Sequence, residues 1–315
     1  MDRLALIQAT REILTRAGFY TSDLQGIRLA GFDIIARRDD VLLIIKVLSN
    51  VDSLTEELAD ELRILSHLLQ AKPLVVGLKN GSGSLEDDVV YYRFGIQAIT
   101  ATTLFSNLLE GVPVHVYAAP GGFYVHLDEQ RLKKLRTQQN LSLGSFARHV
   151  NISRKAVQMY EDGMNARVDI AIRIEELLGD LVTRPIDLLS TENIHIPKST
   201  KDQTFEKMKE FQREAMAMLQ KMGYDLTLVD RCPFQAVSKE KEQLLLTCVH
   251  RYNNRLADRA QVISDISKIT EKHAFLITDK QTTKRNIGGT PVIHRKELKK
   301  TLHAEDLLDL ILDRL

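Results

Sequence analysis

The residues best suited to chemistry are basic and amide side chains in one stretch near the middle of the chain. Between Arg131 and Lys155 the sequence has seven Lys or Arg residues and no Asp or Glu, although the formal net charge of all 315 residues is only +1. Arginine and lysine can donate to O6 and N7 of guanine, and glutamine can pair with adenine. Arg154, Lys155 and Gln158 are therefore candidates for reading DNA bases, within a run whose charge would attract phosphates.

The apolar spacing around this run predicts a small helical domain. Ser142 and Ser153 are suitable N-caps, because a serine hydroxyl can accept a hydrogen bond from an unpaired backbone amide. Ala147 supplies the small side chain that two helices crossing at a short turn require. We expect five helices, at about Glu129–Gln138, Leu143–His149, Arg154–Glu161, Val168–Leu178 and Pro185–Leu189. Their common core would contain Leu132, Leu135, Phe146, Ala147, Val150, Ile152, Val157, Tyr160, Ile170, Ile174 and Leu177.

The same stretch resembles the Cro and lambda-repressor-like (XRE) helix-turn-helix family. The residues that carry the likeness, without a gap, are Leu135-Arg136, Ser142-Leu143, Phe146-Ala147, Val150, Ile152-Ser153, Val157, Tyr160-Glu161 and Gly163. The resemblance implies that the second expected helix spans the DNA backbone and that the third, Arg154–Glu161, lies in the major groove. It also implies a structural ion pair between Arg136 and Glu161, which assigns Arg136 to fold maintenance rather than base reading.

In this family the first residues of the recognition helix reach base edges, while hydroxyls such as those of the serines can meet phosphates. Met159 can touch a thymine methyl but cannot read donors and acceptors. The expected DNA-binding residues are Ser142, Ser145, Ser153, Arg154, Lys155, Gln158 and Met159. A motif that serves protein contacts only, or a basic helix face that is merely solvated, is the alternative. Because one such domain contacts few base pairs, useful specificity predicts a homodimer on two half-sites of double-stranded DNA.

Residues 1–120 have the pattern of a compact α/β domain. Asp2–Ala17 reads as a helix that Gly18 ends, and the strands on either side of Arg38-Asp39-Asp40 read as a hairpin. A second helix, at Leu54–Gln70, further strands and a helix at about Thr102–Glu110 complete the order helix, strand, strand, helix, strand, strand, helix. With 11 basic and 15 acidic residues, this domain is not expected to be the main nucleic-acid surface.

Asp33 and Lys46 lie on the two strands of that hairpin and could belong to a metal-dependent hydrolase. The segments GFDIIA and VLLIIKV resemble the core of the restriction-endonuclease-like fold, whose active site has an Asp on one strand and (Asp/Glu)-x-Lys on the next. Ile44 stands where the second acid is expected, yet two carboxylates jointly hold the Mg²⁺ that activates the attacking water. Unless Glu12 supplies a carboxylate, we expect no catalytic residue, no metal site and no cofactor, and a satisfied pair between Asp33 and Lys46.

The pattern of the front domain returns after residue 200. The segment PFQAVSKEKEQLLLTCVH repeats the strand, charged turn and strand of GFDIIARRDDVLLIIKVLS at a constant offset of 202 positions. Gln235, Leu246 and Cys248 then replace the three positions of the nuclease motif. We expect a second restriction-endonuclease-like domain at 201–315, also catalytically silent, which serves dimerisation, extra DNA contact or sensing.

Composition is that of an ordinary soluble protein, with 44% hydrophobic and 27% charged residues. Cys232 and Cys248 are too few for a disulfide framework, and no apolar run is long enough to cross a bilayer. Met1 is followed by charged Asp2 and Arg3 rather than by a signal-type apolar core. We therefore expect a cytoplasmic protein without a membrane partner. The histidines, His250 among them, show no metal-ligand spacing and are expected to be surface or packing residues.

These features predict an α/β fold in which two restriction-endonuclease-like domains, 1–120 and 201–315, flank an all-α five-helix lambda-repressor-like domain at 128–190. Ala118–Gly122 is the expected hinge and Ser190–Thr200 the expected linker. The arrangement resembles a family of archaeal helix-turn-helix regulators. We expect a DNA-binding transcription regulator rather than an enzyme, and the sequence leaves open whether a small-molecule effector is sensed. The alternatives are a metal-dependent, structure-selective DNA nuclease that uses Asp33 and Lys46, and an assembly adaptor that does not bind DNA.

Overall fold

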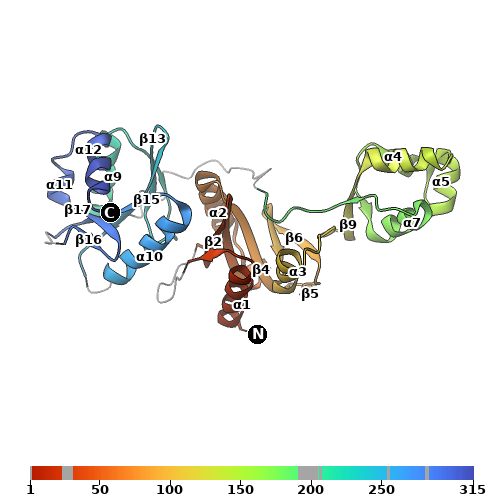
Figure 1. Ribbon diagram of the computed structural model, residues 1–315, viewed down its shortest axis with the longest axis horizontal. Helices are drawn as coiled ribbons and strands as arrows, with labels where there is room; N and C mark the ends of the chain where they lie inside the picture. The colour runs from red at the N-terminus through yellow and green to blue at the C-terminus, as the bar shows by residue number, and fades with distance from the viewer. Residues whose placement is uncertain (1, 23–30, 191–204, 206–207, 254–255, 281–283) are drawn as a thin grey trace.

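The computed structural model describes residues 2–22, 31–190, 205, 208–253, 256–280 and 284–315. Figure 1 shows three bodies in a row, with the first α/β domain in the middle, the C-terminal α/β domain on one side and the helical domain on the other. A narrow connection holds the helical domain away from the first domain. None of the helices in the described part of the chain combines the length and apolar character that a membrane span requires. The expected linker at Ser190–Thr200 lies, after its first residue, outside the described residues.

In its described residues, the first domain has three α-helices around a mixed sheet. The first helix, α1 (Arg3–Arg16), begins at Asp2, whose carboxylate accepts a hydrogen bond from Ala5 N at 2.8 Å. Thr55 caps α2 (Glu56–Leu69) in the same way, as residues with a short side-chain acceptor do. The other elements are β1 (Tyr20–Thr21), β2 (Ile34–Arg38), β3 (Val41–Asn50), the 3-10 turn η1 (Val51–Ser53), β4 (Lys72–Asn80), β5 (Gly83–Ser84), β6 (Val89–Arg93), β7 (Ile96–Ile99) and α3 (Ala101–Leu109).

The sheet of this domain has the strand order β1-β2-β3-β4-β7-β6. The predicted hairpin is β2 and β3, which are antiparallel, whereas β3, β4 and β7 are parallel. Because side chains alternate along a strand, β3 enters two different cores. Leu43, Ile45 and Val47 pack with α1 and α3, and Leu42, Ile44 and Leu48 face the core that contains α2.

The C-terminal domain has the same order of elements. Its sheet runs β12-β13-β14-β15-β17-β16, and its elements are α9 (Glu210–Lys221), β12 (Asp225–Leu228), β13 (Ala236–Glu240), β14 (Gln243–His250), α10 (Leu256–Thr270), β15 (His273–Thr278), β16 (Asn286–Ile287), β17 (Thr290–His294), α11 (Arg295–Leu298) and α12 (Ala304–Leu312). Ile34 pairs with Ile45 in the first sheet, and Ala236 pairs with Thr247 in the second. Ala236 follows Ile34 by 202 positions, and Thr247 follows Ile45 by the same number. The register of the strand pairing therefore agrees with the offset read from the sequence.

The two α/β domains share one hydrophobic core. It contains α2, α10 and the facing sides of both sheets, so the helices form a middle layer between the sheets. The backbones meet where Gly31 N donates to Arg231 O at 3.0 Å. The carboxylate of Glu61 on α2 accepts from the amide of Arg231 at 2.8 Å, and burial raises the pKa of this carboxyl. Long-range contacts of this kind indicate that the domains act as one body.

The helical domain is inserted into the first domain through a short arm of strands. The arm contains β8 (Val116–Ala119), β9 (Gly122–Leu127), β10 (Ala166–Arg167) and β11 (Thr183–Arg184). Its β8 strand continues the first sheet beside β6. The expected hinge at Ala118–Gly122 is instead the tight turn of the β8-β9 hairpin, because Gly121 and Gly122 adopt the positive φ values, 95° and 134°, that glycine tolerates.

Four helices, not five, form the helical domain: α4 (Glu129–Gln138), α5 (Leu143–Val150), α6 (Arg154–Glu161) and α7 (Val168–Leu178). The prediction of a fifth helix at Pro185–Leu189 is wrong. Thr183 and Arg184 pair with β9, and Ile186 bridges Val114. Ile186 and Leu188 are buried in the core of the first domain. Strand pairing and burial in another domain therefore override the helical pattern of this short segment.

Candidate nucleic-acid interface

Helices α5 and α6 form the predicted helix-turn-helix. Ser142 caps α5 by accepting from Ser145 N at 3.1 Å, and Ser153 caps α6 by accepting from Ala156 N at 3.0 Å. Asn151 ends α5 in the left-handed conformation, at a φ of 55°, which turns the chain sharply toward α6. Both predicted caps are confirmed, and each helix begins at the residue that the sequence indicated.

The two faces of α6 differ in character. Val157 and Tyr160 are buried, with 0% and 5% of their surfaces exposed, and they pack with Phe146 and Ala147 of α5. Arg154, Lys155, Gln158 and Met159 recur at the complementary spacing and are all exposed. Ser142 and Ser153 are exposed as well, whereas Ser145 is half-buried on the first turn of α5. Five of the seven expected DNA-binding residues therefore lie at the N-cap or on the exposed face of α6, and Ser142 and Ser145 lie at the start of α5.

Arg136 fixes α6 against α4. Its guanidinium donates from Nε to Glu161 Oε1 at 2.5 Å and from Nη2 to Glu161 Oε2 at 3.1 Å. A third hydrogen bond, from Nη1, reaches Leu141 O at 2.6 Å. The two charged side chains are 9% and 8% exposed. This forked, buried ion pair confirms the structural role expected for Arg136.

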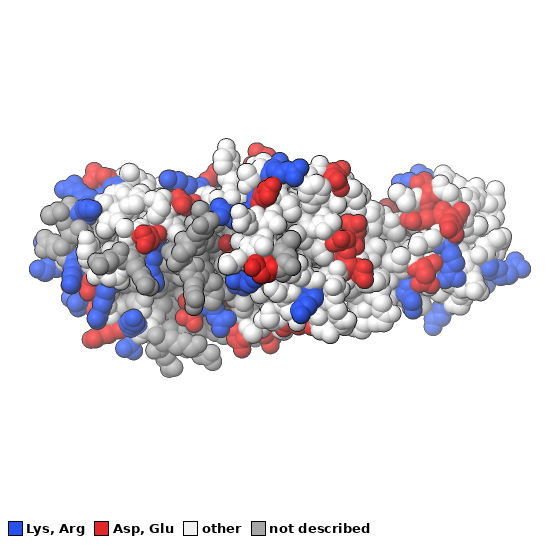
Figure 2. Space-filling model, turned by 90° about the horizontal axis from the view of Figure 1, so that it is seen from below, with Lys and Arg blue, Asp and Glu red and all other residues white. Residues whose placement is uncertain are grey.

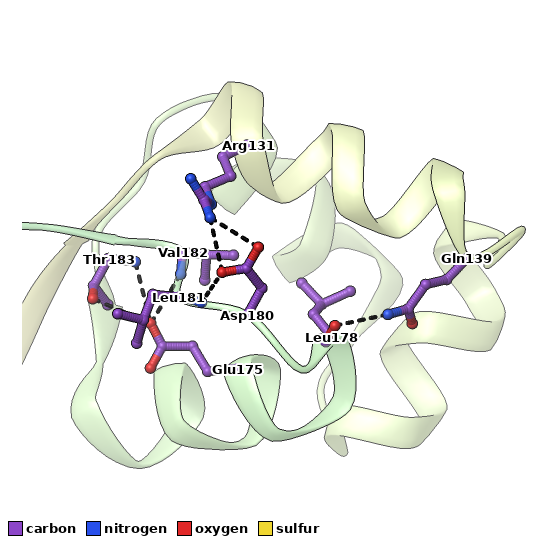
Figure 3. A network of polar contacts seen from close by, with 8 residues as sticks. All are labelled: Arg131, Gln139, Glu175, Leu178, Asp180, Leu181, Val182 and Thr183. Atoms are coloured by element: carbon purple, nitrogen blue, oxygen red, sulfur yellow. Dashed lines mark hydrogen bonds and ion pairs between the residues drawn. The ribbon is translucent and has the colours of Figure 1, made fainter.

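A second polar network ties α7 to the arm (Figure 3). Arg131 donates to both carboxylate oxygens of Asp180 at 2.8 Å, and these hydrogen bonds lower the pKa of Asp180. Glu175 Oε1 accepts from the amides of Val182 and Thr183 at 3.0 and 3.2 Å. Two members of the basic run, Arg131 and Arg136, are thus engaged in holding the domain together. Fewer basic residues are therefore available to contact a ligand than the run from Arg131 to Lys155 contains.

Charge is distributed unevenly over the helical domain. In the view of Figure 2, Lys and Arg side chains project from its outer end and lower edge, whereas Asp and Glu side chains gather nearer its middle. On the face seen in this view, basic and acidic side chains of the domain are therefore segregated.

The nuclease-like centre of the first domain is occupied by the protein's own cations. Arg3 Nη2 lies 2.5 Å from Asp33 Oδ1, and Lys46 Nζ lies 3.5 Å from Asp33 Oδ2. The same Oδ2 accepts from Val47 N at 2.8 Å. Burial lowers the pKa of Lys46 although Asp33 opposes that shift. The carboxylate that would bind a metal is therefore already neutralised, and the satisfied pair expected from the sequence is present.

The other expected metal ligands are not assembled. Ile44 is fully buried in the shared core. Glu12 is exposed on α1 and does not take part in the contacts that the structure records for Asp33. Across the residues that are described, no three His, Cys, Asp or Glu side chains gather as a metal site would require. Gln235, Leu246 and Cys248 occupy the corresponding positions of the C-terminal domain, where Gln235 Oε1 accepts from Val249 N at 2.7 Å.

Comparison with known proteins separates the first α/β domain from the helix-turn-helix in the same way. Residues 132–181 match the family model described as "Helix-turn-helix", and residues 3–114 match the one described as "PD-(D/E)XK superfamily domain". A Methanosarcina acetivorans protein and a Halobacterium salinarum protein are 36% and 34% identical to the chain, over 100% of it and 98% of each relative. An Archaeoglobus fulgidus protein is 35% identical over 98% of both chains. All three are named "Putative HTH-type transcriptional regulatory protein".

The chain belongs to this archaeal family of HTH-type proteins. No solved structure matches it. Within this HTH-type protein, sequence reasoning missed Arg3 as the partner of Asp33 and Gly31 as the point of closest interdomain approach. A Cβ atom at Gly31 would lie 2.6 Å from Arg231 O. Neither role has a local signal, because each depends on a residue far away in the chain.

Proposed function

We propose that the protein is a sequence-specific regulator of transcription that binds double-stranded DNA, reads the major groove with α6 and acts as a homodimer. The observation that carries this proposal is the division of α6 into a buried face, with Val157 and Tyr160, and an exposed face. On the exposed face Arg154, Lys155 and Gln158 offer the donors and acceptors that base edges require. The names of the relatives support the same class of activity.

The serine N-caps fit a backbone-contacting role. The Oγ atoms of Ser142 and Ser153 accept from helix amides, yet a hydroxyl keeps its own proton for donation. A phosphate at either helix start would accept a hydrogen bond from that hydroxyl and would be stabilised by the positive end of the helix dipole. Ser145 would add a contact from the first turn of α5. These contacts would set register, while Arg154, Lys155, Gln158 and Met159 would select the sequence.

We further propose that both α/β domains are catalytically silent and that the C-terminal domain is a second copy of the restriction-endonuclease-like fold. Its strand order and register support the duplication. The neutralised Asp33 and buried Ile44 in the first copy support the loss of catalysis. In this arrangement the fused α/β body carries the helix-turn-helix and supplies the surfaces for dimerisation.

The proposal is tested by measuring the affinity of the full chain for a selected genomic fragment and for a scrambled duplex at two salt concentrations. Affinity for both should fall as salt rises, because released counterions drive phosphate binding. Arg154→Ala should lower affinity for the selected fragment by about 5- to 150-fold, equivalent to about 1 to 3 kcal/mol, and leave the scrambled duplex nearly unchanged. Arg167→Ala is the matched control, since Arg167 is exposed but pairs with Asp169 at 3.1 Å outside α6.

Equal losses on both duplexes would argue against base reading, and an absence of salt-dependent binding would favour the adaptor. A nuclease remains the competing enzyme class because Asp33 and Lys46 do lie together. Incubation of linear and branched DNA with Mg²⁺ or Mn²⁺ decides that question. Metal-dependent cleavage that disappears in Lys46→Ala would overturn the silent role of the first domain.

A further inference from the structure

Near the C-terminal end of β14 lie Arg259 and Lys209, for which the described residues provide no salt bridge to a carboxylate. Arg259, in the first turns of α10, places Nη1 2.8 Å from Nε2 of His250, the last residue of β14. A guanidinium can only donate, so the imidazole nitrogen that it faces must be unprotonated. Burial, followed by the charges of Arg259 and Lys209, lowers the pKa of His250 to about 4. Arg259 therefore contacts a neutral histidine, and Lys209 lies at the start of α9, whose Gln212 donates to Val249 O, beside His250, at 3.3 Å.

Neighbouring basic residues in the same domain are paired. Arg251 approaches Asp279 at 4.0 Å, and Arg295 pairs with Glu214 at 2.5 Å. Within the described part of the chain, neither Arg259 nor Lys209 forms a salt bridge to a carboxylate, and the charged groups that bear on His250 are both positive. Holding like charges around a half-buried imidazole is unfavourable unless an anion compensates them.

In the first domain, the charges at the equivalent strand ends balance one another within the protein. There the cations of Arg3 and Lys46 share the carboxylate of Asp33. At the equivalent position of the second domain, Gln235 keeps the backbone hydrogen bond but carries no charge. His250 stands 202 positions after Leu48, and Lys209 precedes α9 as Asp2 precedes α1. The second copy has therefore lost the internal anion and gained basic groups.

We propose that Lys209, His250 and Arg259 form a phosphate-binding site at the strand ends of the C-terminal domain. The remaining guanidinium N–H groups of Arg259 can grip two phosphate oxygens, and the ammonium group of Lys209 adds a point charge. His250, whose Nε2 accepts from Arg259 Nη1, holds that guanidinium at the strand ends. The phosphate belongs either to the DNA backbone or to a free nucleotide, since both present the same anionic oxygens.

The test is calorimetric titration of the full chain with inorganic phosphate, with dAMP and with a scrambled duplex. Arg259→Gln should weaken binding of inorganic phosphate about tenfold or more, as expected when a charge-assisted contact is lost. Arg285→Gln is the matched control, because Arg285 is an exposed arginine of the same domain that lies 3.8 Å from Asp313. Lys209→Gln, which changes an exposed side chain, gives a second variant if Arg259→Gln does not fold.

The three titrants distinguish the sources of the phosphate. Loss of dAMP binding in Arg259→Gln, with unchanged duplex binding, assigns the site to a free nucleotide. A reduction of about one in the salt slope for the duplex, without dAMP binding, assigns it to the DNA backbone. The inference is overturned if Arg259→Gln leaves the wild-type affinity for all three titrants unchanged or if Arg285→Gln loses as much. Arg154→Ala should not alter phosphate binding, so the proposed phosphate site and the proposed base reading by α6 can be disproved independently.

Discussion

Asp33 and Gln235 accept the same backbone hydrogen bond in the two α/β domains. Asp33 Oδ2 receives it from Val47 N at 2.8 Å, and Gln235 Oε1 receives it from Val249 N at 2.7 Å. The C-terminal domain thus keeps the hydrogen bond although Gln235 carries no negative charge. The acceptor oxygen has a structural role at this strand end, because it satisfies an amide on the neighbouring strand. The negative charge of Asp33 has a separate task, which is to balance Arg3 and Lys46.

Asp33→Asn separates these tasks, because it keeps an acceptor oxygen and removes the charge. We expect a loss of about 3 kcal/mol in the free energy of unfolding at pH 7, since buried Lys46 loses the carboxylate that lies 3.5 Å from its ammonium group. The pKa of Lys46 is already below its usual value of 10.5, and the substitution lowers it further. The unfolded chain then binds more protons than the folded one below pH 10.5, so stability should recover as pH rises. Urea denaturation across alkaline pH measures this recovery, and a loss that does not vary with pH would contradict it.

Ser142→Asp should separate the N-cap role of Ser142 from a phosphate contact. Aspartate caps a helix as well as serine does, so thermal stability should change little. The added negative charge would repel the DNA backbone and lower affinity for selected and scrambled duplexes alike. Ser142→Ala should instead lose about 1 kcal/mol of stability together with the contact. Unchanged duplex affinity in Ser142→Asp would show that this helix start does not face phosphate.

Arg136→Met should destabilise the helical domain by about 3 to 5 kcal/mol, because it leaves Glu161 buried without a partner. Arg131→Met removes an ion pair whose side chains are 49% and 43% exposed, and should lose at most about 1 kcal/mol. Thermal unfolding monitored by circular dichroism compares the two. Similar losses in both variants would mean that the fork between Arg136 and Glu161 does not stabilise the domain as its burial indicates.

Gly31→Ala should loosen the seam between the α/β domains. The new Cβ would lie 2.6 Å from Arg231 O, too close for a backbone atom to tolerate without movement. We expect a loss of about 1 to 3 kcal/mol and faster proteolysis near the seam. Gly144→Ala is the control, because nothing lies within 4 Å of its Cβ position in α5, where alanine should stabilise the helix by up to about 1 kcal/mol. A neutral effect of Gly31→Ala would show that the seam can relax.

His250 should make stability depend on pH in the acid range. Its pKa is about 4 in the folded protein, against 6.5 for the unperturbed group. The unfolded state therefore binds more protons between these values, so this contribution to stability is present above pH 6.5 and is lost as pH falls toward 4. The largest effect is about 3 kcal/mol. His250→Gln should flatten that part of the pH profile, whereas His149→Gln, at an exposed histidine of α5, should leave it unchanged.

Features whose causes are local in sequence could be predicted best. The N-caps at Ser142 and Ser153, the apolar spacing of α6 and the alternation along β3 all depend on residues a few positions apart. The offset of 202 positions between the two hairpins could also be predicted, because it follows from the same alternation of apolar residues. These signals sufficed for the helix-turn-helix, for the first α/β domain and for the offset between the two sheets.

Features that depend on distant partners could not be predicted. Arg3 is an ordinary first-turn residue of α1 until folding brings Asp33 against it. Pro185–Leu189 has an apolar spacing that fits a helix, but the residues just before it pair with β9 and its Ile186 bridges Val114. The pairing of His250 with Arg259 joins a strand end to a helix start across a stretch with no informative spacing. In each case tertiary contacts override or add to the local pattern.

The bridge between Val114 and Ile186 has a consequence for the architecture of the gene product. Because the chain leaves and re-enters the first domain at adjacent points, the residues between the end of β8 and Ile186 form an inserted cassette. A short turn could replace it without parting the strands on either side, and a different reading domain with closely spaced ends could be installed in its place. The same α/β body could in this way serve successive DNA sequences during evolution, with only the cassette exchanged.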